Sequence, residues 1–98
     1  MSLTTKKVVR LGETFQVKNT TTEFDGSVLE PDSHSIQLYK ADGTVEGAAK
    51  TSPSGSAGVY KQTFKIPTDG VPGEWYVDWT FTYSTEDTPR KIKFKVVA

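Results

Sequence analysis

The stretch between residues 74 and 83 alternates between polar and apolar side chains, and this pattern constrains the fold more than any other feature. Its even positions are polar apart from Tyr76. Because successive side chains of a strand point to opposite faces, the pattern predicts a strand with one apolar and one solvated face. A buried aromatic ring removes about 150–250 Å² from water, so this strand is predicted to be the centre of the core rather than a ligand-binding strip. Its apolar face carries Trp75, Val77, Trp79, Phe81 and Tyr83.

Alternation of the same kind recurs along the chain, and no window places apolar residues at helical spacing over three turns. The pattern therefore predicts an all-β protein. Small polar residues fill segment 50–58, which is expected to be an exposed, mobile loop. Three outward lysines in the last strand are expected to discourage pairing with another chain at an exposed edge. Further strands are predicted at 8–11, 13–19, 35–40, 44–49, 58–67 and 90–97, with 44–49 as a weak edge strand.

The composition is typical of one small globular domain. The chain has 98 residues, which is material for a single core, so residues 1–98 are expected to form one domain with 1–7 as a flexible N-terminal tail. Twelve basic and twelve acidic side chains cancel, which removes the positive field that nucleic-acid and anionic-membrane binders use. Neither partner is expected. The absence of cysteine excludes disulfides, thiolate nucleophiles and sulfur-ligated zinc.

About seven short strands separated by turn signals predict an immunoglobulin-like antiparallel β-sandwich with Greek-key connections. The long connection after residue 19 and the Asp42-Gly43 hairpin signal favour the sandwich over its main rival, a five- or six-stranded barrel. The predicted core consists of Phe15, Val17, Ile36, Leu38, Phe64, Trp75, Trp79, Phe81 and Phe94.

The order of "LGETFQVKNTTTEFDG", "IQLYKADGTV" and "GVYKQTFKIPTDGVPGEWYVDWTFTY" resembles the bacterial, archaeal and phage Ig-like domains related to macroglobulin-type and filamin-type modules. The resemblance covers residues 8–97 and rests on short elements: a "DG" loop, a "DG" hairpin, a "GVY" strand ending in proline and an aromatic strand opened by "PG". The pair Trp75 and Trp79 is similar to small Ig-like proteins of tailed-phage structural regions. Such domains are binding or spacer modules without shared catalytic residues, so the resemblance implies a non-enzymatic role.

His34 is the one histidine of the chain, and Ser33 precedes it. Adjacent residues of an extended segment point to opposite sides, so proximity in sequence does not make these two a nucleophile and its base. Neither enzyme activity nor a cofactor is expected.

Five carboxylates form a candidate calcium site. In the predicted sandwich, the loop after the second strand and the final turn lie at the same pole. Calcium prefers oxygen-rich sites, but the spacing matches no EF-hand loop, and solvated loop carboxylates are the commoner case. The five are Asp25, Glu30, Asp32, Glu86 and Asp87.

Tyr39 and Tyr76 are the candidate binding residues. Both occupy outward positions on strands that are expected to be neighbours in one sheet. They form either an ordinary cross-strand pair, which stabilises by about 0.2–1 kcal/mol, or a small aromatic platform that a partner covers.

Three hypotheses about function follow. The first is a structural or interaction module of a phage virion or tail, which binds protein partners through a sheet face, an edge strand or its loops. The second is a carbohydrate-binding or adhesive surface module that uses the two tyrosines and the acidic pole, with calcium. The third is an accessory domain of an extracellular enzyme. No signal-peptide pattern is present, so a virion or the host cytoplasm is the expected location, or the cell surface if the sequence is part of a longer protein.

Overall fold

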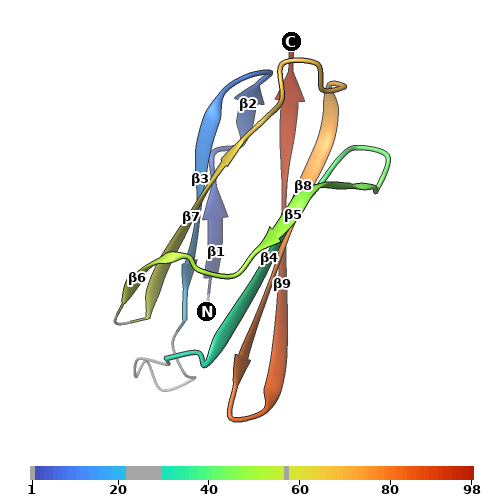
Figure 1. Cartoon of the computed structure of the whole chain (residues 1–98). Coiled ribbons are helices and arrows are strands. Elements are labelled where there is room, and N and C mark those ends of the chain that lie inside the picture. The colour runs from blue at the N-terminus through green and yellow to red at the C-terminus, as the bar shows by residue number, and fades with distance from the viewer. Residues whose placement is uncertain (1, 22–29, 57) are drawn as a thin grey trace.

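The computed structural model describes residues 2–21, 30–56 and 58–98, which form two packed β-sheets (Figure 1). No helix occurs in these ranges, and so none that is long and apolar enough to cross a membrane. The strands of the described residues are β1 (Ser2–Thr5), β2 (Val8–Arg10), β3 (Thr14–Thr20), β4 (Ser33–Tyr39), β5 (Val45–Lys50), β6 (Ser54–Ser56), β7 (Val59–Lys65), β8 (Gly73–Tyr83) and β9 (Glu86–Val97).

The strands are arranged as an immunoglobulin-like β-sandwich, which confirms the predicted fold class. One sheet has the order β1-β3-β7-β6 and the other the order β2-β9-β8-β4-β5. The aromatic strand β8 lies in the middle of the five-stranded sheet, as its alternation predicts, and β5 lies at the edge of that sheet. The pairing is antiparallel except between β2 and β9, which run parallel.

The core lies between the sheets, and all nine predicted core residues are buried. The prediction that Tyr83, at the end of the aromatic face, belongs to the apolar core face is wrong, because this residue is 40% exposed. It is the last residue of β8 before the hairpin to β9, beyond the reach of the facing sheet. The other buried hydrophobic residues are Val9, Tyr60, Ile66, Val77 and Val96.

Two segments that the sequence predicts to be unstructured contain strands. Within the predicted tail 1–7, Ser2–Thr5 form β1, which pairs with β3, and Leu3 packs against the core. Within the predicted loop 50–58, β6 pairs with β7. Both strands are short and mostly polar, so their stability comes from hydrogen bonds to a neighbouring strand rather than from an apolar pattern of their own.

The chain passes from one sheet to the other between β1 and β2. The Lys7 carbonyl accepts a hydrogen bond from the Lys95 amide (2.9 Å), and the Leu11 amide donates to the Val97 carbonyl (2.9 Å). These bonds extend the parallel β2–β9 pair at both of its ends. Along the earlier part of β9, no strand of the described residues covers the outer edge, and there the exposed Lys91 and Lys93 lie.

Candidate functional site

The outer face of the five-stranded sheet brings together the two tyrosines that the sequence singles out. Tyr39 of β4 lies directly opposite Tyr76 of β8 in the strand register. Their ring centroids are 4.6 Å apart and the ring planes differ by 11°, so the rings are stacked. Both side chains are half-buried. The predicted cross-strand pair is therefore present.

A third side chain, Lys91 of β9, completes this stack. Its Nζ lies 4.2 Å from the centroid of the Tyr76 ring, within the range of a cation–π interaction. Because Tyr39 covers one face of Tyr76, Lys91 occupies the other. On the far side of Tyr39, the register places Val45 of β5, which is 53% exposed. We call Val45, Tyr39, Tyr76 and Lys91 the tyrosine ridge.

The ridge presents ring edges and hydroxyl groups to solvent, not the broad faces of its rings. Both faces of Tyr76 are occupied, and one face of Tyr39 is covered by Tyr76. Sequence reasoning placed the tyrosines as neighbours but missed Lys91, which reaches the ring diagonally from a register position opposite Asp78.

Basic side chains of β9 border the ridge on the same sheet face. Lys93 lies opposite Tyr76 in the register, and Lys95 lies opposite Glu74. Lys93 forms an exposed ion pair with Glu74 at 3.6 Å, which contributes little to stability because both groups are solvated. The ridge therefore lies beside a row of lysines that only partly use their charge within the protein.

The candidate calcium residues do not gather into one site in the part of the chain that the structure describes, where no group of three potential ligands could hold a metal ion. Asp32 accepts a hydrogen bond from the Ser84 amide (3.1 Å), which brings this loop to the β8–β9 hairpin. Asp87 accepts one from the Thr82 hydroxyl (2.6 Å). Glu86 is exposed beside it, and Asp25 lies outside the described residues.

Glu30 accepts a hydrogen bond from the Tyr60 hydroxyl, reaching from the loop before β4 to the other sheet. This bond, together with burial, raises the pKa of Tyr60 to about 12. The carboxylate thus serves a contact within the protein.

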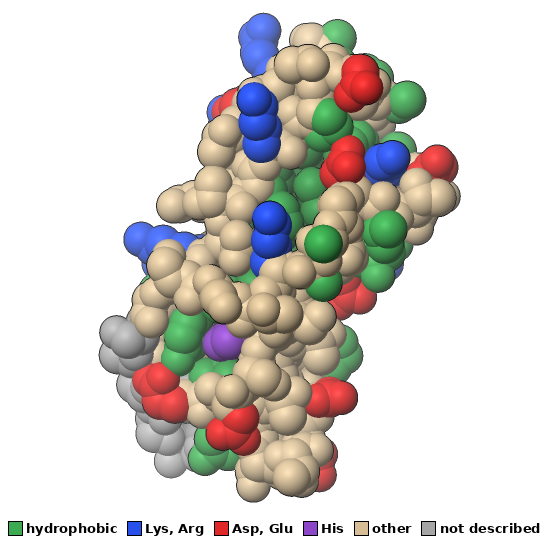
Figure 2. Space-filling view, in the orientation of Figure 1, with side chains coloured by type: hydrophobic (Ala, Val, Ile, Leu, Met, Phe, Trp, Pro, Cys, Tyr) green, Lys and Arg blue, Asp and Glu red, His purple; other side chains and the backbone are tan. Residues whose placement is uncertain are grey.

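His34 and Ser33 point to opposite sides of β4. Ser33 is exposed, whereas the ring of His34 lies 4.6 Å from that of Tyr60 in the other sheet. The indole N–H of Trp79 donates to His34 Nδ1 (3.1 Å), so this nitrogen is an acceptor and carries no proton. Burial lowers the pKa of His34. Figure 2 shows the histidine side chain at the surface in the lower half of the molecule, near acidic and hydrophobic side chains.

Asn19 is the buried polar residue that sequence reasoning overlooked at this end of the sandwich. It is 0% exposed, and neither Oδ1 nor Nδ2 has a hydrogen-bond partner among the described residues. The register places it between Leu3 and Tyr60. An inward asparagine after Phe15 and Val17 is the signal in the sequence that could have identified it.

The comparisons with known proteins bear on the fold. No protein-family model matches the chain, and no curated protein matches it. Among solved structures, Escherichia coli alpha-2-macroglobulin activated by porcine elastase is similar with a TM-score of 0.72 and 20% identity, over 97% of this chain and 8% of that chain. A CARDB domain from Pyrococcus furiosus, in complex with di-metal ions, gives a TM-score of 0.48 and 19% identity, over 97% of this chain and 84% of that one.

The macroglobulin likeness supports the Ig-like sandwich and agrees, at the level of the fold, with the macroglobulin-type resemblance of the sequence. The chain corresponds to a small fraction of the length of that macroglobulin, and neither comparison bears on a phage origin.

Proposed function

We propose that the chain is a non-enzymatic interaction module that binds a protein partner through the tyrosine ridge. The observation that carries the proposal is the stack of Lys91, Tyr76 and Tyr39, with the exposed Val45 at its end. Tyrosines are enriched at protein interfaces because they combine apolar area with a hydroxyl group. A stack that is ordered in advance loses little side-chain entropy when a partner covers it.

The charges around the ridge suggest the chemistry of the partner. Lys91 and Lys93 lie on the ridge face, and Lys95 continues the row along β9. A partner surface with carboxylates around an apolar centre would complement this arrangement in charge and steer association. The ring hydroxyls of the ridge would supply hydrogen bonds to it.

Support for a non-enzymatic role comes from the positions of Ser33 and His34. The two side chains lie on opposite faces of β4, and His34 Nδ1 already accepts a hydrogen bond from Trp79. A general base must lie within hydrogen-bonding reach of the proton that it abstracts, which this arrangement does not provide for Ser33.

Binding measurements on ridge variants test the proposal. Proteins captured from the source organism by the wild type should be lost by the double variant Tyr39→Ser/Tyr76→Ser and kept by Gln16→Ser, which changes the outer face of the other sheet. We expect at least a tenfold weaker affinity for the double variant, which corresponds to about 1.4 kcal/mol. Equal binding of all three proteins would refute a role for the ridge.

A phage virion or tail is the assembly that we propose for this module, and the support is the sequence resemblance of residues 8–97. Mass spectrometry of purified virions and the identity of the neighbouring genes would test it. Genes for capsid or tail proteins on either side would support the proposal, and genes for cell-wall enzymes would contradict it.

The carbohydrate-binding alternative is less well supported, because sugars stack on open ring faces, and the tyrosine stack and Lys91 cover three of the four faces of the tyrosine pair. A glycan array, run with and without a chelator, separates the two functions. Glycan binding that disappears with the chelator would favour the calcium-assisted alternative over the protein-binding module.

A further inference from the structure

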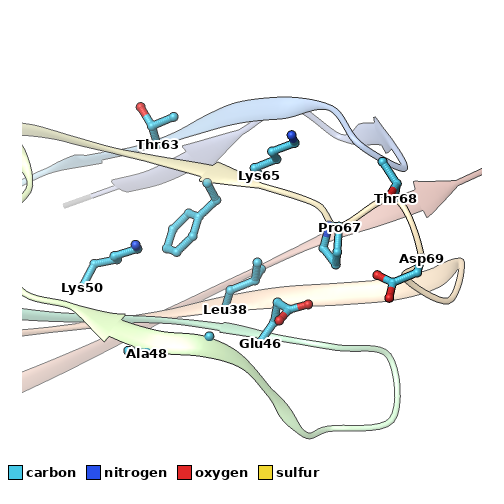
Figure 3. Close-up of a pocket in the computed structure, with 11 residues that line it drawn as sticks. Leu38, Glu46, Ala48, Lys50, Thr63, Lys65, Pro67, Thr68 and Asp69 are labelled. Atoms are coloured by element: carbon cyan, nitrogen blue, oxygen red, sulfur yellow. The ribbon is translucent and has the colours of Figure 1, made fainter.

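The open side of the sandwich between β5 and β7 contains a groove that lies away from the tyrosine ridge. Its volume is about 610 Å³. Leu38 of β4 and Phe64 of β7 line it, and on the β5 side Gly47 has no side chain and Ala48 has only a methyl group, so this wall is low. The groove ends at Pro67, Thr68 and Asp69 on one side and reaches Lys50 on the other (Figure 3).

One wall of the groove is a strand edge with unpaired backbone groups. The Ile66 amide donates to Glu13 and its carbonyl accepts from Gly12, so even-numbered residues of β7 bond to β3. The odd-numbered residues therefore direct their N–H and C=O groups to the other edge. There β6 pairs only as far as Lys61, and in the described part of the chain no backbone partner reaches Thr63 or Lys65 on that edge.

The backbone groups of Thr63 and Lys65 thus face the groove. The Thr63 carbonyl accepts a side-chain hydrogen bond from Gln62 (3.1 Å), which leaves its second lone pair free. Unpaired edge groups of this kind are a template for the addition of another strand.

The opposite wall, β5, contains an irregularity in its pairing with β4. Ile36 pairs with Lys50 and Leu38 pairs with Glu46, so residues 47–49 all lie opposite Gln37. The Gln37 amide group donates to the Gly47 carbonyl (3.1 Å) and to the Leu38 carbonyl (3.0 Å). These bonds fix the bulge, which bends the strand and interrupts the edge.

The two ends of the groove have opposite charge. Glu46 and Asp69 lie toward the end where β7 stops, and Lys50 lies at the other end, whereas the side chain of Lys65, the last residue of β7, points to the outer face of its sheet (Figure 3). Among the described residues, none of Glu46, Asp69 and Lys50 forms an ion pair with another residue. Their charges are therefore available to an occupant.

We propose that this groove binds an extended segment of a partner protein, which adds to β7 as an antiparallel strand. The segment continues the line of β6 and bonds to Thr63 and Lys65. Because it runs opposite to β7, its N-terminal end lies beside Glu46 and Asp69 and carries basic residues. Its C-terminal end lies near Lys50 and is acidic, and alternate apolar side chains cover Leu38 and Phe64. This binding is independent of the tyrosine ridge.

The first test uses a synthetic peptide of about seven residues, which spans about 24 Å when extended at about 3.4 Å per residue. It has lysine at its N-terminal end, glutamate at its C-terminal end and alternating valine and threonine between them. We expect saturable binding, with slower amide hydrogen exchange at Thr63 and Lys65. A peptide with the two charged ends exchanged should bind at least about fivefold more weakly, since it places like charges together.

The second test removes one edge donor without disturbing the sheet. Thr63→Pro deletes an N–H that β3 does not use, and proline is tolerated at such edge positions. The matched control Thr63→Val keeps the N–H. We expect at least about tenfold weaker peptide binding for Thr63→Pro and a change within about twofold for Thr63→Val. Protection of the Phe64 amide, which faces β3, reports whether Thr63→Pro retains the fold.

Three results would overturn the proposal. One is that the wild type shows neither saturable peptide binding nor slowed amide hydrogen exchange. Another is that the peptide and its counterpart with exchanged charges bind equally well. The third is a concentration-dependent dimer of the wild type that is lost in Thr63→Pro, because this edge would then pair with a second copy of the chain. If Thr63→Pro fails to fold, the comparison of the two peptides on the wild type still tests the proposal.

Discussion

The two ends of the core differ in the hydrogen-bond acceptor that they provide for the indole N–H of a buried tryptophan. Trp75 and Trp79 lie on one face of β8, and both are 0% exposed. The indole N–H of Trp75 donates to the backbone carbonyl of Val71 (2.9 Å), whereas that of Trp79 donates to the side chain of His34 (3.1 Å). A carbonyl does not titrate and an imidazole does. The two tryptophans are equally buried, but only the hydrogen bond of Trp79 is expected to depend on pH.

The surroundings of the two indoles follow the same division. Near the Trp75 end, Phe15 contacts Phe94 with ring centroids 4.8 Å apart. At the Trp79 end, the His34 ring contacts Tyr60, and Tyr60 in turn donates a hydrogen bond to Glu30. We call these the apolar end and the polar end of the core. The apolar end is stabilised by packing, and the polar end also depends on hydrogen bonds between side chains.

The largest effect is expected from removal of either indole. Trp75→Ala and Trp79→Ala should each lower the free energy of unfolding by about 3–5 kcal/mol, enough to unfold a domain of ordinary stability. Chemical denaturation measures the loss. The control is Tyr76→Ala on the outer face of the same strand, which should cost about 0.2–1 kcal/mol. A loss below about 1 kcal/mol for Trp79→Ala would contradict its burial in the core.

The next effect concerns Asn19 at the polar end and has the opposite sign. Asn19→Val should raise the free energy of unfolding by about 1–3 kcal/mol, because it removes a buried amide group that has no partner among the described residues. Urea denaturation of both proteins measures the gain. The reverse change on the same strand face, Val17→Asn, should destabilise. If Asn19→Val lowered stability instead, the amide would have a structural partner and the polar end would be better satisfied than we infer.

A smaller effect is expected at alkaline pH. The pKa of Tyr60 rises from 10.0 to about 12 because its hydroxyl donates to Glu30, so the unfolded chain loses this proton at a lower pH than the folded one. Stability should therefore fall as the pH rises from 10 to about 12. Unfolding free energies measured across this range for the wild type and Tyr60→Phe isolate the contribution. Identical slopes for the two proteins would show that the hydrogen bond to Glu30 does not form in solution.

The smallest effect is expected at acidic pH. Burial lowers the pKa of His34, so the unfolded chain binds a proton more readily than the folded chain. The contribution to stability is complete above the ordinary pKa of 6.5 and is lost as the pH falls from there through the lowered folded value. Protonation also removes the acceptor that Trp79 uses. His34→Gln should flatten this part of the pH profile, whereas a profile unchanged by the substitution would remove the contrast between the two ends.

Side-chain parity made much of the fold predictable. A period of two assigns each residue to a face, which is sufficient to place Trp75 and Trp79 in the core and Tyr39 beside Tyr76 on the outer face. The strands β1 and β6 were not predicted, because Leu3 is the one large apolar side chain that the two contain and their pairing depends on β3 and β7.

The polar end of the core was beyond sequence reasoning for a different reason. Parity indicates that His34, Tyr60 and Asn19 point inward, but it does not tell which side chain of the opposite sheet each one meets. The contact of His34 with Tyr60 depends on how the two sheets are placed over each other. For the same reason, sequence could not show which elements the described carboxylates meet, and Glu30 and Asp32 contact different ones.

The parallel pair of β2 and β9 has a mechanical consequence. A force that pulls β2 and β9 in opposite directions acts along these two strands, so the hydrogen bonds between them are loaded together in shear. The bonds from Lys95 to Lys7 and from Leu11 to Val97 share that load. A hairpin pulled open from one end breaks its bonds one after another at much lower force. The placement of β2 against β9 therefore gives the sandwich a clamp that resists extension, a property suited to a module under tension.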